Sequence, residues 1–123
     1  MKLFKTICDV VCKGEGYTFE EISQKSRKQE YVYCRQLIMY FCKSKGEDTL
    51  RVIGSRLAKD HSTVIYSVKA IENYIETDKG RRSVINGYSD DIDKRIVILN
   101  IKKKCGLYNL TQLLKKSLNI FTL

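Results

Sequence analysis

The sequence predicts an all-α fold: a compact helical domain that contains a helix-turn-helix, followed by an extra C-terminal helical tail. Proline is absent and only 7 of the 123 residues are glycine, so few positions would interrupt a helix. Apolar residues recur every three or four positions along most of the chain, which is the spacing of one face of an α-helix. No convincing strand-like alternation competes with this pattern, and the length suits one domain with tails.

Two helices are predicted at the N-terminal end. The first carries an apolar stripe made of Leu3, Ile7, Val10 and Val11. It should end at the Gly-Glu-Gly stretch 14–16, because glycine adopts turn conformations at little cost. Thr18 and Glu21 then have the spacing of a capping box, which predicts a short second helix through Ser23. Residues 24–29 contain no apolar side chain and are therefore expected to form an exposed basic loop.

A stronger helix is predicted from Tyr31 to Lys45. Its apolar positions share one continuous face: Cys34, Leu37, Ile38, Phe41 and Cys42. Gly46 should end this helix, since glycine is the usual residue just past a helix C-terminus. Thr49 is then expected to cap a helix over residues 50–58.

The segment 49–77 is the helix-turn-helix candidate. After a break near Lys59, a longer helix begins whose apolar positions again share one face: Val64, Val68, Ile71 and Ile75. Gly54 should let the two helices cross closely, while Leu57 and Val64 hold them together. The first turn of the second helix is left polar, so it is free to meet a partner.

Beyond this pair the helical pattern becomes weaker. Residues 78–86 continue it, residues 87–91 are expected to form a turn, and residues 92–104 have enough apolar side chains for another helix. A further amphipathic helix is expected over residues 110–118. The predicted organisation is therefore a helical domain at 1–91 with a basic helical C-terminal extension at 92–123.

The charge balance points to a polyanionic partner. The chain carries 23 Lys and Arg against 14 Asp and Glu, a formal net charge of +9. Such an excess favours nucleic acid or an anionic membrane surface. No apolar run is long enough to span a bilayer, and charged residues interrupt the N-terminus before a signal-peptide core develops. We therefore expect no membrane insertion and a cytoplasmic location.

The cysteines and the single histidine argue against a disulfide framework and a metal site. There are five cysteines, an odd number at spacings unlike those of secreted disulfide-rich domains, so reduced thiols are expected. A zinc site would need a cluster of ligands, but His61 is the only histidine, and Cys8 and Cys12 are not spaced as C-x-x-C. No metal and no cofactor are expected.

The polar run Asp60-His61-Ser62-Thr63 contains an acid, a base and two hydroxyls, yet an enzyme is disfavoured. Consecutive residues on a helix do not face one another, whereas a nucleophile and its base must lie within hydrogen-bond reach. No phosphate-binding loop of the form G-x-x-x-x-G-K-[ST] occurs either. A cysteine nucleophile is also disfavoured, because Cys34 and Cys42 are expected to be buried.

Two interpretations of this polar run remain. In the structural one, Asp60, Ser62 or Thr63 caps the helix and His61 is an exposed bystander. In the functional one, short polar side chains at a helix N-terminus approach base edges in a DNA groove while the helix dipole favours nearby phosphates.

The surrounding pattern favours the functional interpretation. The segment 53–64, IGSRLAKDHSTV, carries a D-H-[ST]-T-V signature and resembles the C-terminal DNA-binding domain of the bacterial replication initiator DnaA. The resemblance extends upstream to Lys25-Ser26-Arg27 and to Arg35-Gln36, and downstream through residues 69–72, so it covers about residues 7–86. It implies a Trp repressor-like helix-turn-helix fold. Cys34 and Arg51 stand where the family has proline, and the break before Lys59 is shorter.

The resemblance also implies which residues contact double-stranded DNA. Arg27 becomes the candidate for the minor groove. The candidates for base contacts in the major groove are Asp60, His61, Ser62 and Thr63. The positions that match phosphate-binding residues of the family are Arg35, Gln36, Leu50, Lys59 and Lys69.

The expected function is therefore sequence-preferring binding of double-stranded DNA, in replication initiation or its regulation, with the protein associated with the nucleoid. The chain as given contains no counterpart of the family's ATP-binding domain, so a DNA-binding module is expected. Two alternatives stay open. One is an assembly module that binds a protein partner or a second copy through residues 107–121 of the C-terminal extension. The other is a generic helix-turn-helix transcription regulator.

Overall fold

The computed structural model describes residues 2–46 and 48–105, with the side chains of Lys2 and of residues 102–105 left out of the description. All regular structure in this part of the chain is helical, which confirms the predicted fold class. The helices are α1 (Lys2–Glu15), α2 (Phe19–Ser23), α3 (Gln29–Lys45), α4 (Leu50–Arg56), α5 (His61–Thr77) and α6 (Lys79–Cys105). The amphipathic helix expected at 110–118 lies outside the described residues.

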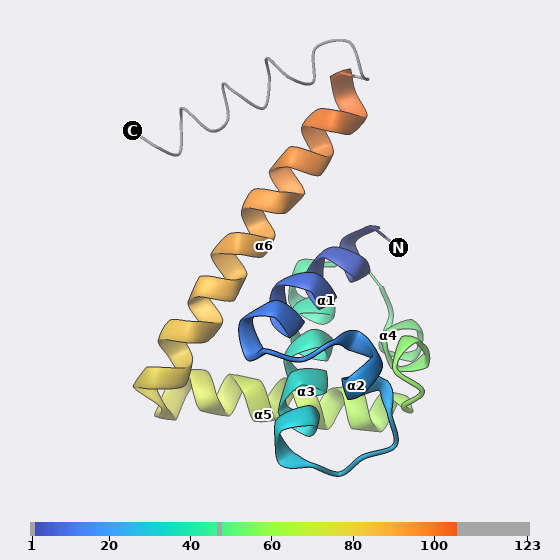
Figure 1. The fold of residues 1–123 in the computed structure, drawn as a ribbon, viewed down its shortest axis with the longest axis vertical. Coiled ribbons are helices and arrows are strands. Elements are labelled where there is room, and N and C mark those ends of the chain that lie inside the picture. Colours follow the sequence, from blue (N-terminus) through green and yellow to red (C-terminus); the bar gives the residue numbers. More distant parts are fainter. Residues whose placement is uncertain (1, 47, 106–123) are drawn as a thin grey trace.

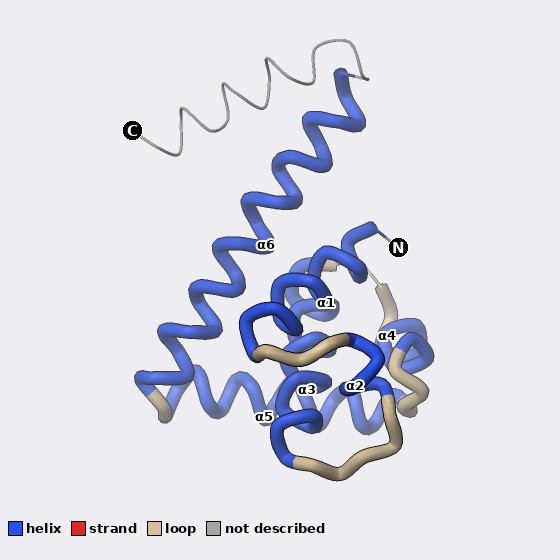
Figure 2. The backbone as a smooth tube through the Cα atoms, viewed as in Figure 1, coloured by secondary structure: helices blue, strands red, loops and turns tan. Residues whose placement is uncertain are grey.

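The central helix α3 organises the domain. It packs against α1 and α2 on one side and against α5, which crosses the base of the molecule, on the other (Figure 1). Helix α4 lies beside the start of α5, and α6 rises from the far end of α5, runs along α1 and projects past it. Figure 2 shows that the connections are short, and that residues 24–28 form an outlying loop at the edge of the domain.

The core consists of the faces that the apolar spacing predicts. On α3, the five predicted positions are all buried: Cys34, Leu37, Ile38, Phe41 and Cys42. They meet Ile7 and Val11 of α1 and Val64 and Ile71 of α5, which are fully buried as well. Burying an aliphatic or aromatic side chain of this size stabilises the fold by about 1.5–3 kcal/mol. Leu3, Val68 and Ile75, also predicted to face inward, pack at the margin of this core.

Side-chain caps fix the starts of α2 and α4 where the sequence predicts them. The hydroxyl of Thr18 accepts a hydrogen bond from the Glu21 amide at 3.1 Å and donates one to the Glu21 carboxylate at 3.2 Å. Thr49 accepts from the Val52 amide at 3.3 Å. These bonds satisfy amides that a helix N-terminus leaves without an intrahelical partner.

The predicted turn at residues 87–91 is wrong, because α6 runs through it without a break. Ile85 and Ile92 lie two helical turns apart and are both buried, and Tyr88 packs between them against the core. This burial outweighs the cost of about 1 kcal/mol that a glycine adds inside a helix. The core therefore continues past residue 91 into the segment predicted to be an extension.

Close contacts hold α6 against α1 and α3. The ring of Tyr88 lies directly against the backbone of Gly14, where a Cβ atom would collide with it. The Tyr88 hydroxyl donates a hydrogen bond to the Glu15 carboxylate. Lys45 of α3 pairs with Asp93 at 3.0 Å.

None of the described helices is both long and apolar enough to cross a membrane.

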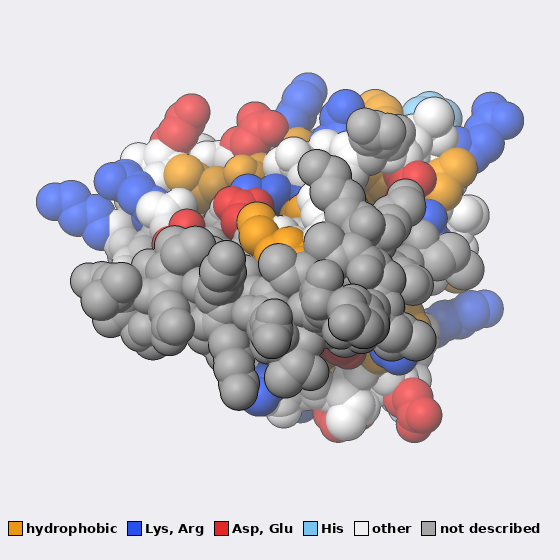
Figure 3. Space-filling model, turned by 90° about the horizontal axis from the view of Figure 1, so that it is seen from above, with side chains coloured by type: hydrophobic (Ala, Val, Ile, Leu, Met, Phe, Trp, Pro, Cys, Tyr) orange, Lys and Arg blue, Asp and Glu red, His pale blue; other side chains and the backbone are white. Residues whose placement is uncertain are grey.

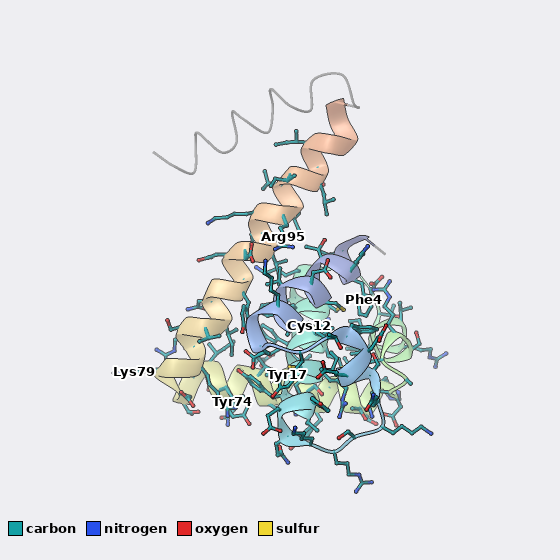
Figure 4. The ribbon with its side chains drawn as sticks, viewed as in Figure 1. Phe4, Cys12, Tyr17, Tyr74, Lys79 and Arg95 are labelled. Carbon is teal, nitrogen blue, oxygen red and sulfur yellow. The ribbon has the colours of Figure 1, made fainter. Side chains whose placement is uncertain are left out.

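The corner between α5 and α6 is fixed by its charged side chains. Figure 4 shows Tyr74 and Lys79 at this corner, where the two helices meet. The Arg81 guanidinium lies over the rings of Tyr33 and Tyr74, at 4.7 and 4.1 Å from their centroids. Arg82 donates to the carbonyl of Ile75 at 2.6 Å and so satisfies the end of α5. These two arginines therefore serve the fold at this corner.

Candidate nucleic-acid interface

The turn between α4 and α5 folds back over Gly54. The Lys59 amide donates to the Gly54 carbonyl at 2.8 Å, and the Leu57 amide donates to the same oxygen at 3.0 Å. A Cβ atom at position 54 would collide with the Lys59 carbonyl and lie 3.2 Å from that of Asp60. Gly54 must be small, but for a different reason from the predicted close crossing of two helices: its close neighbour is the backbone of the turn that follows α4.

Ala58 in this turn has a φ of +54°, in the left-handed region. A side chain there costs about 1–2 kcal/mol, which glycine avoids. We therefore expect Ala58→Gly to raise the free energy of unfolding by up to about 1 kcal/mol, less the entropy that glycine adds to the unfolded chain. Urea denaturation should show a higher midpoint with an unchanged slope. An unchanged or lower midpoint would contradict the strained conformation.

The first turn of α5 presents its polar side chains from a capped helix start. Asp60 is the N-cap: its Oδ1 atom accepts from the Thr63 amide at 2.9 Å and from the Ser62 hydroxyl at 2.8 Å. These hydrogen bonds lower the pKa of Asp60, which therefore stays ionised at neutral pH. Asp60, His61 and Ser62 are exposed and Thr63 is half-buried. The capping interpretation of Asp60 is thus correct, and it leaves the exposed face of the turn available to a partner.

The basic loop at 24–28 is exposed except for Ser26, which is half-buried. Arg27 is the fourth residue of this loop, and the Lys28 ammonium lies 5.2 Å from the centroid of the Tyr31 ring. Figure 3 shows lysine and arginine side chains projecting around the periphery of the molecule, with Asp and Glu side chains among them. The net charge of +9 suits a protein that meets a polyanion.

Arg35 requires a correction. The sequence resemblance implies a phosphate contact for it, but its side chain is buried, with only 6% of the residue exposed. The guanidinium donates to the carbonyls of Ile22 at 2.7 Å, Gln24 at 3.3 Å and Ser26 at 2.6 Å. Burial lowers its pKa. The guanidinium therefore makes its hydrogen bonds within the domain, at the wall of the groove described next.

A groove of about 510 Å³ separates the basic loop from the recognition helix α5. Both sides contribute predicted site residues to its walls: Arg27, Arg35 and Gln36 on one side, Lys59 and Thr63 on the other. Arg35 is the buried member of this set. The remaining base-contact candidates lie on the α5 turn between Lys59 and Thr63. Two predicted phosphate residues lie off the groove walls: Leu50 is the first residue of α4, and Lys69 is exposed further along α5. The structure thus brings the two predicted DNA-reading elements to one surface.

Tyr66 is a candidate contact that sequence reasoning missed. The tyrosines were expected to serve core or rim packing, but Tyr66 is 69% exposed and lines the groove. Residues three apart on a helix share a face, so its place one turn after Thr63 is the signal that could have revealed it.

The described cysteines do not form a reactive site. Cys8, Cys12, Cys34 and Cys42 are free and buried. Burial raises the pKa of Cys34 and of Cys42 to about 12, and that of Cys8 further still. Since the thiolate is the nucleophile, these thiols are poorly suited to covalent catalysis at neutral pH.

The part of the chain that carries the candidate interface matches a known protein family. The family described as the bacterial DnaA protein helix-turn-helix matches residues 4–71 of this chain, which contain the basic loop, α4, the first two-thirds of α5 and most of the core. The match therefore covers more than half of the chain and all of the predicted site residues.

Individual relatives match the chain as well, two of them over a longer part than the family does. The chromosomal replication initiator protein DnaA of Bacteroides fragilis is 37% identical over 92 residues, 74% of this chain and 19% of the relative. The DnaA protein of Spiroplasma citri is 34% identical over 92 residues, 74% of this chain and 20% of the relative. The chromosomal replication initiator protein DnaA 1 of Chlamydia pneumoniae is 44% identical over 66 residues, 54% of this chain and 14% of the relative.

The chain thus spans about a fifth of the length of the first two relatives, and it matches the helix-turn-helix part of the family. That domain is the DNA-binding one and not the ATPase. Together with the six helices of the described residues and the capped D-H-S-T turn, the match shows that this chain belongs to the family of bacterial DnaA helix-turn-helix domains.

Proposed function

We propose that this chain binds double-stranded DNA with a preference for sequence, and that it serves replication initiation or its regulation in the cytoplasm, at the nucleoid. The observation that carries the proposal is the groove between the 24–28 loop and the start of α5. Membership of the DnaA helix-turn-helix family supports DNA binding in general. The preference for sequence and the residues below are our inference from the geometry.

The groove has the form expected of a protein that reads two adjacent DNA grooves. The major groove of B-DNA admits an α-helix, and an arginine fits the narrow minor groove. One sugar–phosphate strand separates these grooves, so a protein that enters both must straddle that strand. Arg27 and Thr63 lie on opposite sides of the cleft, with Gln36 and Lys59 on its walls. We infer that the strand runs through this cleft.

Each residue then has a role that follows from its position. In the minor groove, Arg27 contacts base edges. In the major groove, the contacts come from Asp60, His61, Ser62 and Thr63. Phosphates on the strand between and beside the grooves are held by Gln36, Lys59, Lys69 and the backbone amide of Leu50. Tyr66 packs against the strand from the α5 side. Phosphate contacts supply affinity and register, whereas base contacts supply preference.

His61→Ala and Lys69→Ala separate these two kinds of contact. We expect His61→Ala to reduce the preference for the best base at one position by roughly five- to a hundredfold. Lys69→Ala should weaken all duplexes alike and lower the slope of log affinity against log salt by about one. Titration of a labelled duplex, its single-base variants and several salt concentrations measures both effects.

Wild-type protein on the same duplexes provides the reference for both variants. A swapped pattern, with loss of preference in Lys69→Ala and a uniform loss in His61→Ala, would mean that the assignment of the grooves is wrong. Equal and negligible binding of wild type to every duplex would contradict the function itself.

A further inference from the structure

The buried guanidinium of Arg35 is the anchor of the basic loop. Arg35 lies on the second turn of α3, and its three acceptors are the carbonyls of Ile22, Gln24 and Ser26. These residues run from the end of α2 to the middle of the loop, so the chain wraps around one side chain. No buried side-chain nitrogen or oxygen in the described part of the chain lacks a hydrogen-bond partner.

Arginine is suited to this place for a physical reason. Its guanidinium is planar and holds five N–H donors in a fixed fork, whereas the lysine ammonium is a compact point donor. A buried cation is tolerated only when its donors are satisfied, and here carbonyl oxygens satisfy them. The loop offers the core no apolar side chain of its own. Its position relative to α5 therefore depends on these hydrogen bonds.

We propose that Arg35 is the positioning residue of the 24–28 loop: it sets the distance between Arg27 and the first turn of α5 and binds no phosphate itself. This inference rests on the proposed function for its consequence on DNA. Ser26 is the immediate neighbour of Arg27, and the bond of 2.6 Å from Arg35 to its carbonyl fixes the backbone there. Arg35 thus determines whether the loop and α5 can enter adjacent grooves together.

A double-mutant cycle with Arg27 distinguishes positioning from direct contact. Arg35→Lys keeps the positive charge but cannot reach all three carbonyls. We expect it to weaken binding to a duplex with a DnaA-type site by nearly the same factor as Arg27→Ala, about tenfold or more. In the double variant the losses should not add, because the loop contact is already gone. Independent, additive losses would overturn the proposal.

The salt dependence gives a second readout. In an Arg27→Ala background, Arg35→Gln removes a charge that contacts no phosphate under our proposal. The slope of log affinity against log salt should therefore stay the same. A direct phosphate contact would instead lower that slope by about one, which would contradict the positioning role.

Measurements on the free protein keep the proposal separate from the DNA-binding proposal. Amide hydrogen exchange of residues 24–28 should accelerate in Arg35→Lys, while amides near Ile71 in the core of α5 keep their wild-type protection. Equal exchange in the loop of both proteins would overturn the proposal even if DNA binding is confirmed.

The wild-type protein supplies a test that needs no variant to fold. The Nη–H resonances of Arg35 should be observable in the free protein, since these groups are buried and donate hydrogen bonds to backbone carbonyls. They should keep their positions on addition of saturating duplex, whereas those of Arg27 shift. A shift of the Arg35 resonances as large as that of Arg27 would indicate a phosphate contact and contradict the proposal.

Discussion

Replacing Gly54 with alanine is expected to lower the free energy of unfolding by about 1–3 kcal/mol, the usual cost of forcing atoms into a packed site. The added Cβ atom would collide with the Lys59 carbonyl. That oxygen belongs to the backbone of the turn, so it can move only if the turn between α4 and α5 opens. Opening the turn also displaces the first turn of α5, so we expect binding to DNA to weaken in parallel.

Gly87→Ala is the matched control, because it makes the same chemical change inside α6. A Cβ atom at position 87 meets nothing within 4 Å. Alanine is the better helix former, so this variant should be more stable than wild type by about 1 kcal/mol. Urea denaturation of both variants measures the two opposite shifts. A Gly54→Ala variant as stable as wild type would show that the turn does not lie against α4 as described.

Two substitutions at Asp60 are expected to separate its capping role from its contact with DNA. Asp60→Asn keeps an oxygen that can accept from the Thr63 amide, and asparagine is as good an N-cap as aspartate. Its melting temperature should therefore stay near that of wild type at neutral pH. Asp60→Ala removes the acceptor and leaves the Thr63 amide without a cap, so its melting temperature should fall.

On DNA, both substitutions should reduce the preference for cytosine at the contacted position, because a carboxylate accepts from the cytosine amino group. Asp60→Asn tests this contact most cleanly, since the helix start stays intact. Titration with duplexes that differ at single base pairs measures the preference. If Asp60→Asn keeps the wild-type preference at every base pair, Asp60 serves only as a cap.

The pH dependence of stability provides a further check on Asp60. The hydrogen bonds from Thr63 and Ser62 hold the pKa of folded Asp60 below the ordinary aspartate value of 3.8, so its cap stabilises the fold fully above that pH. This contribution is lost as the pH falls through the folded-state pKa. Asp60→Asn should lose less stability than wild type between neutral and strongly acidic pH, as thermal denaturation at several pH values would show.

Most of the fold could be predicted because its signals are local. Thr18 and Thr49 each cap an amide three residues further along the chain. The apolar faces of α3 and α5 repeat every three or four residues. The sequence shows both kinds of signal directly. The turn expected near Gly87 was wrong for the opposite reason. Whether the chain turns or stays helical at this point depends on the burial of Ile85 and Ile92 against helices distant in the sequence. A glycine alone does not reveal that burial.

Part of the candidate site could also be predicted from local signals, and part of it could not. The exposed turn from Asp60 to Thr63 could be predicted, because helical phase and the family signature both point to it. The true surroundings of Arg35 could not. Its burial depends on where the carbonyls of a loop about ten residues upstream come to lie, and nothing in the pattern of apolar residues specifies that position.

The central claim is that the loop and the start of α5 together read double-stranded DNA by sequence. The most direct test is a titration of the wild-type chain with a duplex that carries a DnaA-type site and with a scrambled duplex of the same composition, at two salt concentrations. We expect salt to weaken both complexes. The preference for the site should be about tenfold or more and should persist at the higher salt concentration. Equal affinity for the two duplexes at both salt concentrations would contradict the claim.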